Sequence, residues 1–172
     1  MATNIEIKAR LPDAGRTLRL VESLVGSPPE VIEQEDAFFR TPSGRLKLRI
    51  FASGEGELIY YERPDAGRPK TSDYFIYRTS DPDSLRALLD LALGTRGIVR
   101  KTRRLYLVGQ TRIHLDRVEG FGDFLELEVV LEEGQDPGEG VRIAEDLMAR
   151  FEIREADLEE EAYIDLLEAA SS

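Results

Sequence analysis

A chain of 172 residues is long enough to bury the core of one domain of ordinary size, and its 41% hydrophobic and 33% charged residues fit a globular protein with many charged positions. With no cysteine and a single histidine, the chain excludes disulfides, thiolate metal sites and multi-histidine zinc sites, so a bound metal is expected on oxygen ligands. The net charge of −11 arises mostly in residues 119–172, where 18 acidic residues accompany three arginines.

The predicted elements alternate between strands with a two-residue repeat and helices with an apolar stripe. Alternation predicts strands over residues 4–11, 30–40, 45–51, 57–63, 73–79 and 98–108, and the two arms of a hairpin over 112–131. Capping signals and apolar periodicity predict helices that begin at Pro12-Asp13 and at Asp81-Pro82-Asp83, and further helices over 141–151 and 163–170. In the second helix, the residues expected to face the core are Leu85, Leu88, Leu89, Ala92 and Leu93.

The charged residues of these strands fall on one face, opposite the apolar residues. On the first strand this face holds Asn4, Glu6, Lys8 and Arg10, and on the third it holds Arg45, Lys47 and Arg49. The hairpin turns at Gly120 and Gly122, and its polar face holds Arg112, His114, Asp116, Phe124, Glu126 and Glu128. In the strand over 98–108, Lys101 and Arg103 share one face and Arg100, Thr102 and Arg104 share the other; the alternation leaves open which face is turned inward.

Repetition of the charged face on strand after strand predicts the fold. A single such face normally meets water. Here, however, the apolar stripes of the helices need an apolar surface, and the opposite faces of the strands provide it. Hairpin connections dominate, and eight strands suffice to close a barrel. We therefore predict an α+β fold, an eight-stranded and largely antiparallel closed β-barrel with helices packed outside and a polar lumen.

A charged lumen indicates an ionic ligand, because unpaired burial costs several kcal/mol per ion. Three cations in a row over residues 45–49 repel one another unless an anion joins them. Guanidinium and ammonium groups match phosphate oxygens, and the carboxylates suit divalent cations. The predicted ligand is a polyanion such as a triphosphate, together with a divalent metal.

Other partners and compartments are disfavoured. No apolar run approaches the roughly 20 residues of a membrane span, and the first 25 residues carry too many charges for a signal peptide. The sequence thus predicts a cytoplasmic protein with no membrane partner. The basic run over residues 100–104 has no interleaved aromatic residues and the chain is acidic, so nucleic acid is not an expected partner.

Several of these residues form motifs of a known family. NIEIK at residues 4–8 resembles the N-terminal ExExK signature of the CYTH family, the triphosphate tunnel metalloenzymes. Lys101 with Arg103, Leu115-Asp116, and GFGDFLELE at residues 120–128 resemble the second half of this family, especially in its class IV adenylyl cyclases. The resemblance implies one CYTH-like domain over residues 1–172, with the acidic helical region 136–172 packed on the barrel. It further implies Mg²⁺ or Mn²⁺ as cofactor, ATP or tripolyphosphate as ligand, and a homodimer.

The resemblance also implies roles for individual residues. Metal ligands are expected at Glu6, Glu126 and Glu128. Substrate-binding cations are expected at Lys8, Arg10, Lys47, Arg49, Lys70, Lys101, Arg103 and Arg112. Catalytic roles are expected for Lys8, Lys101 and Asp116. Two positions depart from the family pattern: Asn4 stands where the signature has its first Glu, and Glu62 stands where the fourth strand usually has a Lys, for which Arg63 or Lys70 could substitute.

Three functions fit these motifs. An adenylyl cyclase converts ATP to cyclic AMP and pyrophosphate. A triphosphatase directs water at a terminal phosphorus of tripolyphosphate, thiamine triphosphate or a nucleoside triphosphate. A non-catalytic module binds a phosphate ligand without turnover, which Asn4 and Glu62 would explain. The cyclase-like second half favours the first function. His114 shares a face with Asp116 and fits either a general base or a hydrogen-bonded structural histidine.

Overall fold

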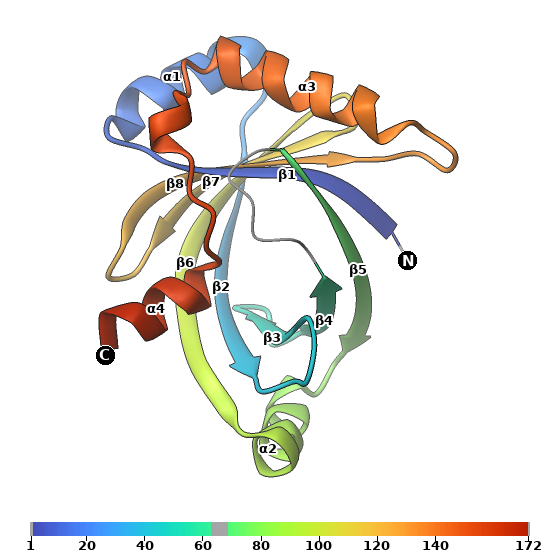
Figure 1. Ribbon diagram of the computed structural model, residues 1–172. Coiled ribbons are helices and arrows are strands. Elements are labelled where there is room, and N and C mark those ends of the chain that lie inside the picture. The colour runs from blue at the N-terminus through green and yellow to red at the C-terminus, as the bar shows by residue number, and fades with distance from the viewer. Residues whose placement is uncertain (1, 63–68, 172) are drawn as a thin grey trace.

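Eight antiparallel strands close into a barrel in the computed structural model, which describes residues 2–62 and 69–171 (Figure 1). The strands are β1 Ala2–Arg10, β2 Glu30–Phe39, β3 Arg45–Phe51, β4 Gly56–Glu62, β5 Lys70–Thr79, β6 Thr95–Val108, β7 Thr111–Val118 and β8 Gly122–Val130. Their order around the barrel is β1-β5-β4-β3-β2-β6-β7-β8. The predicted eight-stranded closed barrel is confirmed.

Four helices accompany the barrel: α1 Ala14–Val25, α2 Pro82–Leu93, α3 Pro137–Arg150 and α4 Tyr163–Ser171. The Asp13 and Asp81 side chains accept hydrogen bonds from backbone N–H groups at the starts of α1 and α2, as their positions in the sequence predict. Asp136 caps α3 in the same way, so this helix begins four residues earlier than its apolar stripe indicates. No helix within 2–62 and 69–171 has both the length and the apolar character needed to cross a membrane.

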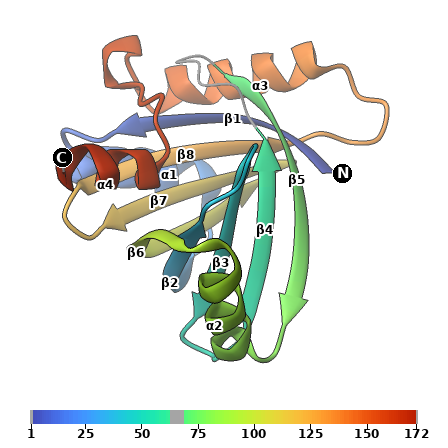
Figure 2. The same cartoon turned by 60° about the horizontal axis from the view of Figure 1, so that its bottom comes forward.

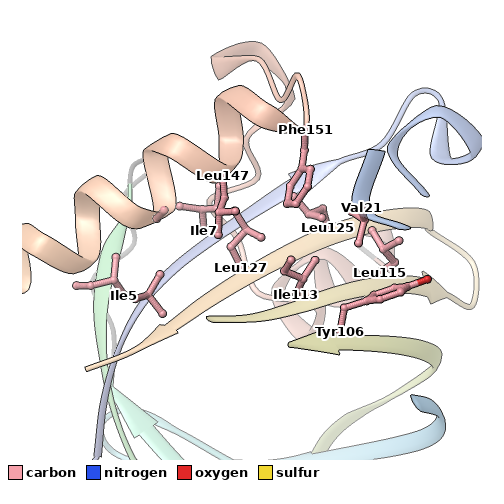
Figure 3. Packing of buried hydrophobic residues seen from close by; sticks show 12 residues of the cluster. Ile5, Ile7, Val21, Tyr106, Ile113, Leu115, Leu125, Leu127, Leu147 and Phe151 are labelled. Atoms are coloured by element: carbon pink, nitrogen blue, oxygen red, sulfur yellow. The ribbon is translucent and has the colours of Figure 1, made fainter. Parts of the chain in front are cut away.

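The larger apolar core lies outside the barrel wall. α1 and α3 cover the outer faces of β1, β7 and β8 (Figures 1 and 3). Ile113 and Leu127 lie opposite each other in the β7–β8 register, and both are fully buried in this core, with Leu147 and Phe151 from the α3 side. A slip of one residue would turn the charged faces into this core, so its burial fixes the register of the hairpin.

The second helix packs differently from the prediction. Leu85 and Leu89 contact the small cluster around Phe39 and Leu48 on β2 and β3. Leu88 and Leu93, however, are 62% and 38% exposed, and Ala92 is also exposed. The prediction that these three face the core is wrong. α2 touches the barrel along a narrow stripe only, and periodicity does not tell how wide a stripe the neighbouring strands will cover.

α4 lies against β6 (Figure 1). It lies on the opposite side of the barrel from β5 (Figure 2). Gly97 of β6 allows this contact, because a Cβ at residue 97 would come within 2.9 Å of the Ile164 and Leu167 side chains. Ile164 is fully buried in a second cluster with Phe38 and Phe124. This packing places Tyr163, the first residue of α4, at the lumen of the barrel.

Candidate functional site

The barrel encloses a cavity of about 240 Å³, and we call this cavity the lumen. Among the described residues, six cations line it: Lys8, Lys47, Arg49, Lys101, Arg103 and Arg112. The carboxylates that line it are Glu6, Glu57, Glu126 and Glu128. The predicted polar lumen is therefore confirmed, and the face of β6 that is turned inward is the one that carries Lys101 and Arg103.

Unsatisfied polar atoms gather in the same cavity. Four buried side-chain atoms in the described part of the chain lack a hydrogen-bond partner: Asn4 Oδ1, Gln34 Oε1, Arg112 Nε and His114 Nδ1. All four residues line the lumen. Since nearly all buried polar atoms are hydrogen-bonded, this concentration of exceptions indicates a cavity built to receive polar or charged groups.

Two similar side-chain groups lie in the wall of the lumen, and we call them the first and second Lys-x-Arg units. Each unit combines a Lys-x-Arg pair with an aspartate on the neighbouring strand. In the first unit, Asp36 of β2 accepts two hydrogen bonds of 2.8 Å from Arg49 of β3 and lies 3.2 Å from Lys47. In both units the arginine and the aspartate are opposite each other in the strand register. The forked geometry fixes the guanidinium plane.

The second unit repeats this pattern on β6 and β7. Asp116 accepts hydrogen bonds of 2.7 and 2.6 Å from Arg103 and lies 3.5 Å from Lys101. Burial alone would raise the pKa of both aspartates, but the adjacent cations outweigh it. Arg49 and Lys47 hold the pKa of Asp36 far below its usual value, and Arg103 and Lys101 lower the pKa of Asp116 to about 2. Both aspartates are therefore ionised at neutral pH.

The pKa values of the two lysines are lowered, whereas those of the two arginines are raised. Burial lowers the pKa of Lys47 to about 8, although Asp36 opposes the shift. Burial and the neighbouring Arg103 also lower the pKa of Lys101. Arginine keeps its charge at any physiological pH, so Arg49 and Arg103 are permanent cations, whereas the charge on the two lysines depends on pH.

A cluster of three metal-ligating side chains lies on β7 and β8. Ligand atoms of His114, Glu126 and Glu128 all lie within 4.8 Å of one another. His114 Nδ1 is 3.7 Å from Glu126 Oε2 and 3.7 Å from Glu128 Oε1. Burial, together with Arg103, lowers the pKa of His114, which favours the neutral imidazole. A neutral imidazole with two carboxylates can bind a divalent cation.

The chain that leads into α4 reaches Lys8 and the second unit. The Lys8 ammonium donates a hydrogen bond to the Glu161 carbonyl. The Tyr163 hydroxyl donates to Asp116 at 3.0 Å, and the Tyr163 ring lies 4.3 and 4.7 Å from the Lys8 and Lys101 ammonium groups. The acidic region after residue 136 therefore contributes directly to the wall of the lumen.

Some predicted residues lie elsewhere. Arg10 is outside the lumen, where its half-exposed side chain pairs with Glu159 at 2.8 Å. Strand alternation put Arg10 on the correct face, but β1 ends at this residue and its side chain lies beyond the cavity. Lys70 begins β5 opposite Glu6, but its side chain is outside the described part of the chain, as is Arg63.

The structure explains both the row of three cations on β3 and the glutamate at position 62 of β4. Arg45 pairs with Asp165 of α4 at 2.8 Å, so the three cations of β3 do not share one anion. Glu62 lies on a separate surface pocket with Arg45 and Asp165. The residues of β4 that line the lumen are Glu57, Ile59 and Tyr61. Glu62 therefore does not take the place of a lumen lysine.

Sequence reasoning missed Asp36 and Tyr163. Asp36 lies in a predicted strand, yet only the pairing of β2 with β3 brings it to Arg49. Tyr163 begins a predicted helix, but its position in the lumen depends on the packing of α4. The mutual repulsion of the three cations over residues 45–49 was the one available signal that a nearby anion was needed.

The CYTH domain model matches residues 2–163 of this sequence. The chain belongs to the CYTH family. It is 27% identical to adenylate cyclase CyaB of Aeromonas hydrophila, over 95% of this chain and 88% of that protein.

Two solved structures show the same fold. PH1012 from Pyrococcus horikoshii OT3 is 31% identical, with a TM-score of 0.85 over 95% of this chain and 98% of that one. HpAC1 from Hippeastrum, described as having a dominant triphosphatase activity, is 16% identical with a TM-score of 0.69, over 99% and 96% of the two chains. At this identity the second similarity shows the fold alone.

Proposed function

We propose that this protein acts on a triphosphate within the lumen, as an adenylyl cyclase that uses Mg²⁺ or Mn²⁺. The observation that carries the proposal is the composition of the lumen wall, where fixed arginines, lysines and a group of metal-ligating side chains surround unsatisfied polar atoms. Similarity to adenylate cyclase CyaB supports the cyclase reaction. A triphosphate bound with a divalent cation would meet partners of both charges.

In this proposal the two units hold the phosphate chain. Arg49 and Arg103 present fixed forks to phosphate oxygens, because Asp36 and Asp116 orient them. Lys8 and Lys101 touch the reacting phosphates and offset the charge that develops on them. Asp116 acts through Arg103 and Lys101, since its oxygens are already occupied, and is a positioning residue.

Metal binding is proposed at the carboxylates Glu6, Glu126 and Glu128. Glu126 and Glu128 belong to the cluster with His114, and Glu6 lies opposite Glu128 in the β1–β8 register. A divalent cation held there would neutralise part of the negative charge of the triphosphate. Lys47 and Arg112 complete the set of cations around the chain of phosphates.

The cyclase step needs no covalent attachment to the protein. The ribose 3′ oxygen forms a bond to the α-phosphorus, the bond from that phosphorus to the oxygen bridging to the β-phosphate breaks, and pyrophosphate leaves. The proton of the 3′ hydroxyl passes to water. The cationic side chains bind the departing pyrophosphate charge, so positioning and electrostatics supply the rate enhancement.

A triphosphatase is the alternative, and the size of the lumen favours it. At about 240 Å³ the cavity is smaller than the roughly 300–1,000 Å³ of typical small-molecule sites, so it suits a bare polyphosphate chain better than a whole nucleotide. The fold shared with HpAC1 is compatible with this reaction. Water would then attack a terminal phosphorus in place of the ribose oxygen.

One assay distinguishes these functions. Purified protein is incubated with ATP or tripolyphosphate and Mg²⁺ or Mn²⁺; we expect cyclic AMP and pyrophosphate from ATP. Orthophosphate as the main product would replace the cyclase with the triphosphatase, and tight binding without products would indicate a binding module. Glu6→Gln and Glu126→Gln should abolish the activity, whereas Arg10→Ala, outside the lumen, should retain it. Unchanged activity in both glutamine variants would overturn the metal assignment.

A homodimer stays a prediction, which light scattering tests.

A further inference from the structure

His114 Nδ1 lies in an environment that no hydrogen bond in the structure explains. The side chain is 5% exposed, and its Nδ1 atom has no hydrogen-bond partner among residues 2–62 and 69–171. Its neighbours are two carboxylate oxygens, each 3.7 Å away, on Glu126 and Glu128. This distance exceeds the range of an N–H···O hydrogen bond. A buried nitrogen of this kind needs a partner.

Neither a protonated nor an unprotonated Nδ1 is satisfied at this position. If Nδ1 carries the proton, its acceptors are out of reach. If Nδ1 carries the lone pair, two negatively charged oxygens face that lone pair. A cation between the three atoms removes the conflict, because the nitrogen lone pair and both carboxylates then point at positive charge.

The three ligand atoms also have suitable spacing and support. Metal–ligand bonds of roughly 2.0–2.3 Å set neighbouring ligands about 3–4 Å apart. His114 and Glu126 are opposite each other in the β7–β8 register, as are Arg112 and Glu128. Arg103 and Arg112 bind the two carboxylates at 3.1 and 2.9 Å and limit their rotation. The site is therefore held by paired strands, not by a loop.

We propose that His114 Nδ1 is a metal ligand beside Glu126 and Glu128. This site then binds Mn²⁺, or another divalent transition-metal ion that takes nitrogen ligands, in preference to Mg²⁺. Mg²⁺ prefers oxygen and keeps much of its water, whereas an imidazole nitrogen raises the affinity for transition metals in the order Mn²⁺ below Co²⁺. The use of this metal in turnover rests on the proposed function; its binding does not.

The inference changes two expectations from the sequence. A bound metal was expected on oxygen alone, since one histidine cannot build a multi-histidine site. One histidine is nevertheless enough when two carboxylates complete the set. Glu6 lines the same lumen but is not among the three residues whose ligand atoms lie within 4.8 Å. The histidine is then neither the general base nor the structural residue that the sequence left open.

The single histidine makes a direct test practical. Untagged protein labelled with ¹⁵N-histidine gives the signals of one imidazole. We expect ¹¹³Cd²⁺, a diamagnetic probe, to shift the Nδ1 resonance and to split it by scalar coupling, while Nε2 keeps its proton. An Nδ1 signal unchanged at saturating Cd²⁺, or coupling to Nε2 in place of Nδ1, would overturn the assignment.

Calorimetry then measures selectivity with the metals alone. We expect Mn²⁺ to bind at least about tenfold more tightly than Mg²⁺. His114→Gln, which replaces the nitrogen by an amide group, should bring the two affinities within about threefold, and Glu126→Gln should weaken both. Ser72→Ala is the matched control, since it alters the lumen but removes no ligand of this set.

The outcomes separate the inference from the proposed function. Equal Mn²⁺ and Mg²⁺ affinities in the unaltered protein contradict the inference but leave a triphosphate site intact. Failure of the protein to bind tripolyphosphate contradicts the proposed function, while the ¹¹³Cd–Nδ1 coupling still supports the metal site.

Discussion

The two Lys-x-Arg units are built alike but are connected differently. Each has an arginine that forms a two-pronged ion pair with a buried aspartate on the next strand. In the first unit Asp36 pairs with Arg49 and Lys47. In the second, Arg103 also binds Glu126 of the metal-ligating cluster, and Asp116 also receives the Tyr163 hydroxyl.

One local side-chain pattern therefore supports two tasks in this barrel. The first unit orients its cations toward the lumen through Asp36. The second unit connects that cluster, through Arg103, with the chain leading into α4, through Tyr163. A change in the second unit should therefore affect phosphate binding, metal binding and stability together, whereas a change in the first should affect fewer properties.

The largest expected effect is on stability. Asp116→Asn and Asp36→Asn each remove a buried aspartate that pairs with two cations, and breaking a buried ion pair from one side costs about 3–5 kcal/mol. Urea denaturation at pH 7 should give the larger loss for Asp116→Asn, because it also weakens the Tyr163 contact. The control is Asp123→Asn, whose partner Arg117 is 75% exposed. Equal losses in Asp116→Asn and the control would contradict the role of the second unit.

The same aspartate predicts a dependence on acid. The pKa of Asp116 is about 2 in the folded chain, below the ordinary value of 3.8. The unfolded chain therefore takes up a proton first, so the stabilisation by Asp116 is present above about pH 4 and is lost as the pH falls toward 2. Asp116→Asn should lose less stability than the unaltered protein over this range. A parallel loss in both proteins would show that other groups dominate.

Substitution of Arg49 and of Arg103 should affect phosphate binding alike but metal binding differently. Arg49→Ala and Arg103→Ala should each weaken tripolyphosphate binding by roughly ten- to a hundredfold, since a charged hydrogen bond contributes about 1.5–3 kcal/mol. Arg103→Ala should tighten the binding of Mn²⁺ alone, and more than Arg49→Ala does, because the positive charge that it removes lies directly beside Glu126. Calorimetry measures both. An equal response of Mn²⁺ binding to the two variants would remove the distinction between the units.

The lysine of the first unit should make binding depend on pH. Because the pKa of Lys47 is about 8, its charge disappears above that pH, and tripolyphosphate affinity should fall by up to about tenfold per pH unit between pH 8 and 9. Lys47→Arg keeps its charge and should flatten this part of the profile. An unchanged profile in Lys47→Arg would assign the dependence to another group, such as Lys101 of the second unit.

The smallest effect is expected at the contact with α4. Tyr163→Phe removes one hydrogen bond to Asp116 and should lower the free energy of unfolding by about 1 kcal/mol. The control is Tyr77→Phe on the outer face of β5, where the side chain is 59% exposed and little change is expected. If the two variants are equally stable, the Tyr163 hydroxyl does not support the second unit.

The sequence by itself determined which side chains share a strand face. A strand repeats every two residues, so alternation assigned Arg112 and Glu128 to one face of the hairpin and Ile113 and Leu127 to the other, and the glycine-containing turn set their register. The eight strands and the polar lumen followed from the same repeat. Helix capping was also local, as Asp13 and Asp81 show.

Only the tertiary structure decided which faces meet across the barrel. Asp36 meets Arg49 through the register of the paired strands β2 and β3, and Tyr163 reaches Asp116, 47 residues away in the sequence, through the packing of α4. The exposure of Leu88 likewise depends on how little of α2 the barrel covers. His114 shows the limit most clearly, because its face was readable from alternation, while its unpaired nitrogen between two carboxylates exists only once β7 and β8 are built into the closed barrel.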